Sequence, residues 1–251
     1  MDQKAILGID VGGTGIKGAI VDVETGLMLT EKIKIATPQP ATPDAISDTI
    51  CQLIDTFGYE GIVGCGFPSV LKSGKVITAT NLDPSWIGMQ LDVLLQKKTG
   101  LPFTVINDAD IAGVAEVNFG AAKDCNGTVI MITLGTGVGS GILHEKKLLK
   151  NSELGFLPLR GGIAEVRVSN LARKKYALSW VAWGKRLREY LLLLERLFHP
   201  EMIVLGGGVC KKFDKFEAFT QINTPVVPAE LENNAGCIGA AWYAYYQGDH
   251  K

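Results

Sequence analysis

The 251-residue sequence has almost no net charge, no long hydrophobic stretch and few cysteines. Its formal net charge of −1 at pH 7 argues against binding to nucleic acid or a membrane surface through bulk charge. No apolar run reaches the roughly 18–20 residues of a membrane-spanning helix, and the N-terminus lacks the layout of a signal peptide. The five cysteines stand singly, without a CxxC pair, which predicts neither a disulfide framework nor a zinc site. We therefore expect a cytoplasmic protein without zinc.

Glycine is the residue in excess. The sequence has 30 glycines in 251 residues, about 12%, against a usual value of about 7%. They gather in short groups after apolar runs, at 8–18, 135–141 and 206–208. Glycines in such places let backbone N–H groups approach a ligand closely, which indicates phosphate.

The apolar pattern predicts an α/β protein with two similar halves. In the first half we expect strands at 5–11, 16–23, 27–35, 62–67, 75–80 and 103–106 and helices at 43–57, 89–98 and 109–118. In the second half we expect strands at 128–134, 142–149 and 202–205 and helices at 179–198 and 234–247. Each half opens with a strand, a turn containing Gly-Thr-Gly and another strand, which indicates an internal duplication and two domains.

The first Gly-Thr-Gly turn lies in a segment, 10–18, that contains the pattern GxGxxG. A dinucleotide-binding fingerprint requires a helix after this turn, but the alternating β-branched residues that follow predict a strand. No GxxxxGK[ST] motif of a Walker A loop is present. A glycine-rich hairpin without a ligand remains one reading, and a phosphate-binding hairpin is the other. The candidate phosphate-binding residues are Gly12, Gly13, Thr14, Gly15 and Lys17.

A second copy of the hairpin, at 134–141, favours phosphate binding, because two facing hairpins can hold one phosphate chain from both sides. Asp10 ends a buried strand beside the first hairpin, where its carboxylate can hold a hydrated Mg²⁺. The candidate residues of the second hairpin are Gly135, Thr136, Gly137 and Gly139.

The sequence resembles the ROK sugar kinases of the actin/hexokinase superfamily, and in particular the polyphosphate glucokinase (polyphosphate/ATP-glucomannokinase) branch. The resemblance rests on the two hairpins, NDAD at 107–110, NSELG at 151–155 and GGGV at 206–209. Further similar segments are TPQPATPDAI, GCGFPSVLKSG, ANLDPSWIG and TPVVPAELENNAG. The resemblance implies two actin-like (ribonuclease H-like) domains with a cleft between them. We assign residues 1–110 and 111–251 to these domains, with the option that helix 234–248 packs back on the first.

The resemblance also implies a Mg²⁺-dependent kinase that phosphorylates a hexose, with glucose and its 6-hydroxyl expected, from polyphosphate or ATP. Asp108 matches the general base of the family, although an aspartate at the start of a helix can also be an N-cap. The family's sugar ligands correspond to Asn81, Asn107, Asp108 and Glu153.

Two departures from the family pattern bear on these expectations. Phe156 stands where ROK kinases have a histidine, so a hydrogen-bond partner of the sugar is replaced by an apolar ring, and we expect this change to affect the glucose affinity, the preferred sugar or the activity. Residues 157–180 contain no cysteine or histidine, which again predicts no zinc.

A basic segment bears on which phosphoryl donor the protein binds. Residues 160–188 carry eight basic side chains and one acidic one, a net +7 in a chain of −1. Such a segment can be a solvated surface, but a polyphosphate chain needs a row of basic residues beyond its reacting end. The candidate nucleotide or polyphosphate residues are Arg173, Lys174, Lys175, Gly206, Gly207, Gly208, Lys211 and Lys212.

Two other functions compete with a kinase. A weakly catalytic sugar- or phosphate-binding regulator is one, although ROK repressors carry a DNA-binding segment before the first strand and only four residues precede Ala5 here. An actin-like filament ATPase is the other, disfavoured by the sugar-site segments. The family suggests a homodimer, for which the apolar run 191–194 offers an interface.

Overall fold

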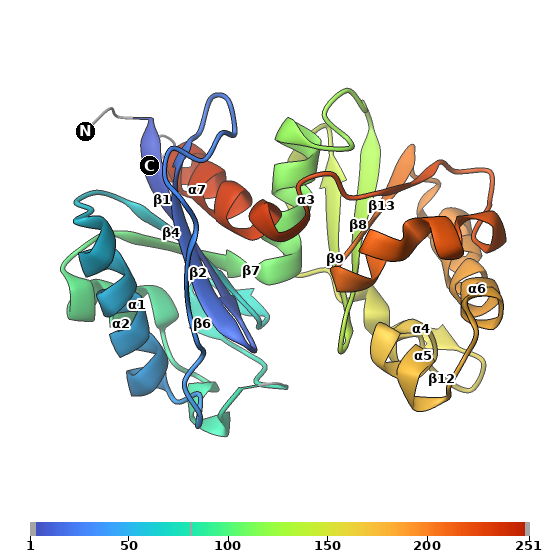
Figure 1. Ribbon diagram of the computed structural model, residues 1–251, viewed down its shortest axis with the longest axis horizontal. Helices are drawn as coiled ribbons and strands as arrows, with labels where there is room; N and C mark the ends of the chain where they lie inside the picture. Colours follow the sequence, from blue (N-terminus) through green and yellow to red (C-terminus); the bar gives the residue numbers. More distant parts are fainter. Residues whose placement is uncertain (1–3, 81, 249–251) are drawn as a thin grey trace. The chain divides into compact units, whose positions relative to one another are not determined.

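Two five-stranded sheets with the same strand order organise the chain (Figure 1). The computed structural model describes residues 4–80 and 82–248. One unit consists of the residues up to Ile111 and those from Asn234 onward, and the other consists of Ala112–Asn233. None of the helices in the described ranges has the length and apolar character needed to cross a membrane.

The sheet of the first unit has the order β3-β2-β1-β4-β7. Its strands are β1 (Ala5–Gly12), β2 (Gly15–Asp22), β3 (Ile33–Ile35), β4 (Val63–Phe67) and β7 (Phe103–Asn107). β2 runs antiparallel to both β1 and β3, whereas β1, β4 and β7 are parallel. The carboxyl ends of the three parallel strands therefore lie at one edge of the sheet. A small hairpin of β5 (Leu71–Lys72) and β6 (Lys75–Val76) and the 3-10 helix η1 (Pro84–Trp86) lie between β4 and β7 in the chain.

The two faces of this sheet are covered differently because side chains alternate along β1. Leu7 and Ile9 are fully buried in the core with helices α1 (Pro43–Phe57) and α2 (Leu91–Thr99). On the other face, Gly8 and Gly64 pair in register, and a Cβ atom on either one would lie 1.9 Å from a carbonyl oxygen of α7 (Ala235–Gly248). Only glycine at both positions lets the backbone of α7 rest directly on the sheet.

The sheet of the second unit has the order β10-β9-β8-β13-β14. Helix α6 (Trp180–Phe198) buries Trp183, Leu187, Leu191 and Leu194 completely against one face. The second half of α3 (Asp108–Phe119) packs on the other face, where Gly113 lies against Met131 and Leu143. The strands are β8 (Thr128–Leu134), β9 (Val138–His144), β10 (Lys147–Leu149), β13 (Met202–Gly206) and β14 (Val226–Pro228).

Short elements complete the second unit. They are η2 (Leu154–Phe156), β11 (Pro158–Leu159), β12 (Gly162–Ile163), α4 (Glu165–Val168), α5 (Asn170–Lys175), η3 (Gly208–Lys215) and η4 (Glu217–Phe219). A last 3-10 turn, η5 (Glu232–Asn234), precedes α7.

Several predicted boundaries are wrong. The strand expected at 27–35 is only β3, because the hydroxyl of Thr30 replaces a ladder partner by accepting the Ile20 N–H at 3.0 Å. The strand expected at 75–80 is only β6. The strand expected at 142–149 is divided between β9 and β10, since Glu145 and Lys146 turn the chain with φ of 49° and 61°.

The run 191–194, which the sequence offers as a dimer interface, is partly exposed only at Leu192 and Leu193. Leu191 and Leu194 are fully buried in the core of their own unit, so they are not available to a second chain. The homodimer itself stays a prediction.

Candidate active site

The carboxyl edge of the first sheet gathers polar side chains. Asp10 lies near the end of β1, and Asn107 and Asp108 lie at the end of β7 and the start of α3. The Asn107 amide donates to the carbonyl oxygen of Ser69, which follows β4, at 3.1 Å. Ligands of α/β sheets bind at this edge, so the position suits a substrate site.

Asn107 takes most of the capping role that the sequence left open for Asp108. Its side-chain oxygen accepts the N–H groups of Ala109 at 2.8 Å and Asp110 at 3.2 Å. Asp108 is exposed, and its carboxylate accepts the neighbouring Ala109 N–H at 2.9 Å. The exposed Asp108 carboxylate thus lies in the first turn of α3, whose cap is supplied mainly by Asn107.

Lys17 links the first hairpin to the acidic residues. Its ammonium donates to Asp10 Oδ2 at 2.8 Å. Burial alone would lower the pKa of Lys17, but the Asp10 carboxylate and, more weakly, Asp108 outweigh this effect and raise it. Lys17 thus stays protonated beside both carboxylates. Gly13 and Thr14 are exposed at the tip of the same hairpin, as expected for phosphate ligands.

Lys34 belongs to the same surface, and the sequence analysis missed it. It lies directly opposite Lys17 in the register of β2 and β3. Its side chain covers the first hairpin, since a Cβ atom on Gly15 would lie 2.1 Å from Lys34 Cε. The alternation Lys-Ile-Lys-Ile at 32–35 was the available signal, because it places both lysines on one face. Two lysines at one hairpin favour an anionic ligand.

Two segments that carry candidate residues for binding the phosphoryl donor pack against the second hairpin within the second unit. Gly135 N–H donates to Gly137 O at 3.0 Å, and Thr136 is exposed at the tip. Gly135 O accepts the Leu171 N–H at 3.1 Å, which brings α5 and its basic residues to the hairpin. A Cβ atom on Gly207 would lie 2.6 Å from Leu134 O, so the 206–208 turn packs against the base of the same hairpin.

Glu165 is a second residue that the sequence analysis missed. Its Oε2 accepts the Val138 N–H at 2.9 Å and so fixes the hairpin from α4. Burial raises the pKa of Glu153, and the negative charge of Glu165 raises it further. The Ser140 hydroxyl holds the Glu153 segment, donating to Ser152 O at 2.5 Å and accepting the Leu154 N–H at 2.9 Å. The hairpin and the sugar-binding candidate therefore form one connected group.

The raised pKa of Glu153 predicts a stability effect. The folded protein binds this proton more tightly than the unfolded chain, so Glu153 reduces stability progressively as the pH rises above its ordinary pKa of 4.5. Glu153→Gln should raise the Tm at pH 7, and the gain should vanish near pH 4. Thermal unfolding at several pH values measures this, with Glu60→Gln, an exposed glutamate, as control. An unchanged or lower Tm at pH 7 would contradict the prediction.

Four of the eight basic residues at 160–188 are engaged by the protein itself. Arg160 and Arg167 both contact Glu189 Oε2, at 3.4 and 2.8 Å. Arg188 donates to Gln221 O at 2.7 Å. Arg173 lies over the Trp180 ring, with Cζ 4.1 Å from the centroid. These contacts hold the side chains of the four arginines against the protein surface.

Two of the other four lie beside Tyr176. Lys175 Nζ and Arg186 Cζ each lie 5.7 Å from the centre of the Tyr176 ring. Lys174 and Lys185 are exposed. We call Lys174, Lys175, Lys185 and Arg186 the basic cluster. Of the remaining candidates, Lys212 is exposed, whereas Lys211 pairs with Glu232 at 2.9 Å.

Two candidates concern the sugar. Phe156, in place of the family's histidine, follows Glu153 within one 3-10 turn and is 53% exposed, so its ring is available to a ligand. Asn81 lies outside the described residues.

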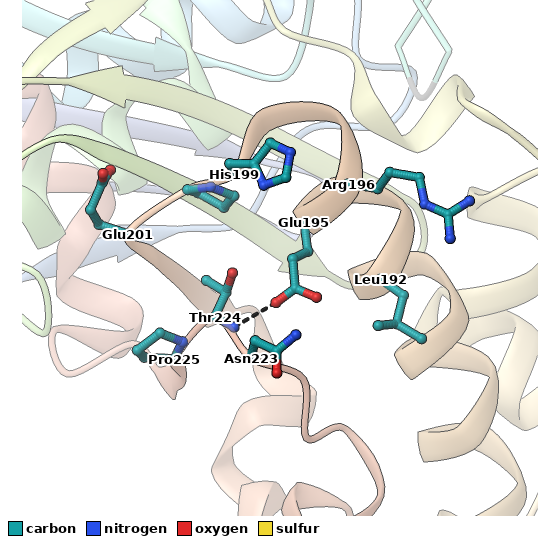
Figure 2. Close-up of a pocket in the computed structure, with 9 residues that line it drawn as sticks. Leu192, Glu195, Arg196, His199, Glu201, Asn223, Thr224 and Pro225 are labelled. Atoms are coloured by element: carbon teal, nitrogen blue, oxygen red, sulfur yellow. Dashed lines mark hydrogen bonds between the residues drawn. The ribbon is translucent and has the colours of Figure 1, made fainter.

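A cavity of about 630 Å³ lies elsewhere, at the end of α6 (Figure 2). Glu195 Oε1 accepts the Thr224 N–H there at 2.5 Å. None of the predicted site residues that the structure describes lines this cavity. Its lining residues are Leu192, Glu195, Arg196, His199, Pro200, Glu201, Asn223, Thr224 and Pro225.

Comparisons with known proteins agree with this architecture. The sequence profile of the ROK family matches residues 6–157. The chain is 42% identical over 240 residues to a polyphosphate glucokinase of Mycobacterium tuberculosis, covering 95% of this chain and 91% of that protein. The crystal structure of the inorganic polyphosphate/ATP-glucomannokinase of Arthrobacter sp. strain KM matches with a TM-score of 0.91 and 41% identity, covering 97% of this chain and 99% of the other.

A second solved structure is the ROK family glucokinase of Streptomyces griseus in complex with glucose and AMPPNP. It matches with a TM-score of 0.84 and 26% identity, covering 96% of this chain and 99% of the other. These similarities confirm the α/β fold of two actin-like units that the sequence predicted.

Proposed function

Because the chain belongs to the ROK family, we propose that it is a sugar kinase that transfers a phosphoryl group from polyphosphate or ATP to a hexose, with glucose and its 6-hydroxyl as the expected acceptor. One observation carries the proposal. Lys17, at the glycine hairpin, forms an ion pair with Asp10, and the negative charge of Asp108 contributes to its raised pKa. The proposed phosphate-binding and proton-accepting groups therefore share one edge of the first sheet.

The reaction follows from the roles these residues can take. The sugar hydroxyl oxygen attacks the terminal phosphorus of the donor, the bond to the rest of the donor breaks, and the hydroxyl proton passes to the Asp108 carboxylate. Lys17 and the hairpin N–H groups neutralise and orient the transferred phosphoryl group. Asn107 and Glu153 bind sugar hydroxyls, because amide and carboxylate oxygens accept hydrogen bonds at fixed angles.

Mg²⁺ fits the residues present only as an ion shared with the donor. No group of three His, Cys, Asp or Glu suited to a metal occurs within the described residues. Mg²⁺ commonly keeps several waters and binds through one or two carboxylates and the phosphates of a substrate. Asp10 meets this description. Lys17 donates to its Oδ2, and the Asp10 side chain remains 17% exposed, so the carboxylate can still contact an ion. When bound, the ion would neutralise phosphate charge.

A coupled assay of sugar phosphorylation tests the proposal. A panel of hexoses is offered with polyphosphate or ATP as donor. Phosphorylation of at least one hexose, dependent on Asp108, supports the proposal. Binding of sugars without phosphorylation by either donor would replace it with a binding protein on the same fold. The panel also defines the effect of Phe156 on the preferred sugar.

The basic cluster is the part of the donor site that we assign to long polyphosphate rather than ATP. A triple change of Lys174, Lys175 and Lys185 to Gln should raise the KM for long-chain polyphosphate by about tenfold or more, since each exposed charge contributes up to about 1 kcal/mol. The KM for ATP should stay unchanged, and the salt dependence of polyphosphate use should weaken.

The matched control changes Lys72, Lys97 and Lys147, three exposed lysines elsewhere, to Gln. Equal losses in both triple variants would mean that only net charge matters. Equal losses for ATP and polyphosphate in the cluster variant would mean that the cluster does not distinguish the two donors.

A further inference from the structure

The chain passes between the two units twice. It enters the second unit between Ile111 and Ala112, inside the continuous helix α3, and it returns between Asn233 and Asn234, just before α7. Since α3 begins with Asp108, whatever fixes this helix also fixes the carboxylate of the candidate base.

The first half of α3 is held within the first unit. A Cβ atom on Gly66 of β4 would lie 2.1 Å from Ile111 Cδ1, and one on Gly239 of α7 would lie 2.0 Å from Ile111 O. Both elements thus touch Ile111 closely. These contacts hold the helix against β4 and α7 at Ile111.

The second half of α3 is held by a buried carboxylate. Glu116 is fully buried, and its side chain accepts three backbone hydrogen bonds. The donors are the N–H groups of Ala121 at 2.8 Å, Glu230 at 3.2 Å and Leu231 at 2.9 Å. An ionised carboxylate only accepts, so three converging N–H groups suit it and compensate its burial.

The surroundings are built for this side chain. A Cβ atom on Gly120 would lie 2.1 Å from Glu116 Oε2, so only glycine leaves room for the carboxylate. The Glu116 backbone oxygen accepts the N–H groups of Gly120 and Ala122, both at 3.1 Å. The turn after α3 is thereby wrapped around Glu116. Through Glu230 and Leu231, the carboxylate also ties the segment that leads to the second crossing directly to the helix of the first.

We propose that Glu116 is a positioning residue, which joins the two chain crossings and so sets the orientation of the helix that carries Asp108. This role rests on the proposed function. Without the tie, residues 230–231 move independently of α3 and the Asp108 carboxylate loses alignment with the sugar hydroxyl. A water oxygen then attacks the donor phosphorus more often, and inorganic phosphate is released in place of sugar phosphate.

Glu116→Gln tests the role, because the amide is of similar size but turns an N–H₂ group toward backbone donors. Hydrogen exchange of Ala121, Glu230 and Leu231 should become faster. The kcat for sugar phosphorylation should fall by about tenfold or more, because small misplacements of a catalytic group have large effects. The ratio of inorganic phosphate to sugar phosphate should rise, while the KM for sugar changes less than about twofold. Gly120→Ala, which displaces the same carboxylate, should act in the same direction.

Glu195→Gln is the matched control. Glu195 also accepts a backbone N–H, that of Thr224, and it ties α6 to a loop of the same unit away from both crossings. It should lower the Tm but keep the wild-type kcat and phosphate ratio. The proposal is overturned if Glu116→Gln and Gly120→Ala lower only the Tm, or if Glu195→Gln causes the same loss of transfer. If the wild-type protein phosphorylates no hexose, the proposed function itself is refuted. The results with these variants alone cannot refute it.

Discussion

Asp108→Asn is expected to reduce the turnover of sugar phosphorylation by at least about 10²–10⁴-fold, the loss typical of removing a general base. The amide oxygen can still accept the Ala109 N–H that Asp108 accepts at 2.9 Å, so the start of α3 should persist. Asn107, which caps the helix, is untouched. The loss should therefore appear in kcat, with the Tm and the KM for sugar close to those of the wild type.

Asp22→Asn is the control for this change. Asp22 also ends a strand of the first unit and accepts a nearby backbone N–H, that of Glu24 at 2.9 Å. It lies outside the proposed site, so full activity is expected. An Asp108→Asn variant that kept most of its phosphoryl transfer would remove Asp108 from the mechanism.

Asp10→Asn is expected to lower turnover by about 10²–10³-fold, comparable to the loss of a group that stabilises transition-state charge. The amide is a poorer Mg²⁺ ligand than the carboxylate, and Lys17 loses its charged partner at 2.8 Å. The Mg²⁺ concentration needed for half-maximal activity should rise. A titration with Mg²⁺ at saturating sugar and donor measures both effects.

Lys17→Gln separates the two causes. It also breaks the ion pair but leaves the Asp10 carboxylate in place. It should raise the KM for the donor with little change in the Mg²⁺ requirement. If both variants shift the Mg²⁺ requirement equally, the broken ion pair explains the loss and Asp10 does not bind the metal.

The sequence was informative where neighbouring residues carry the signal. The two hairpins and the helix at 179–198 depend on local alternation and periodicity, and the structure forms both hairpins and α6 close to the expected bounds. The duplicated order of strands follows from the repeat of these local units. Asn107 and Asp108 were placed correctly at the junction of β7 and α3, because an apolar strand ends there and a helix begins.

The sequence was uninformative where distant residues meet. Lys34 reaches the first hairpin only through the register of β2 and β3, and Glu165 reaches the second from a helix of four residues. Which basic residues are held by the protein and which form the basic cluster depends on contacts with Glu189, Gln221 and Trp180. Leu191 and Leu194 fill the core of the second unit, whereas Leu192 and Leu193 of the same apolar run are partly exposed, and the run alone did not show this division.

The packing of α7 on Gly8 and Gly64 has a consequence for biosynthesis. The strands of the first sheet leave the ribosome before the second unit, but the helix that covers one of its faces emerges after that unit. The second unit is a continuous stretch of chain and is available for folding before then. The first unit is therefore completed only after the whole second unit has been synthesised, in contrast to the usual N-to-C order of domain folding.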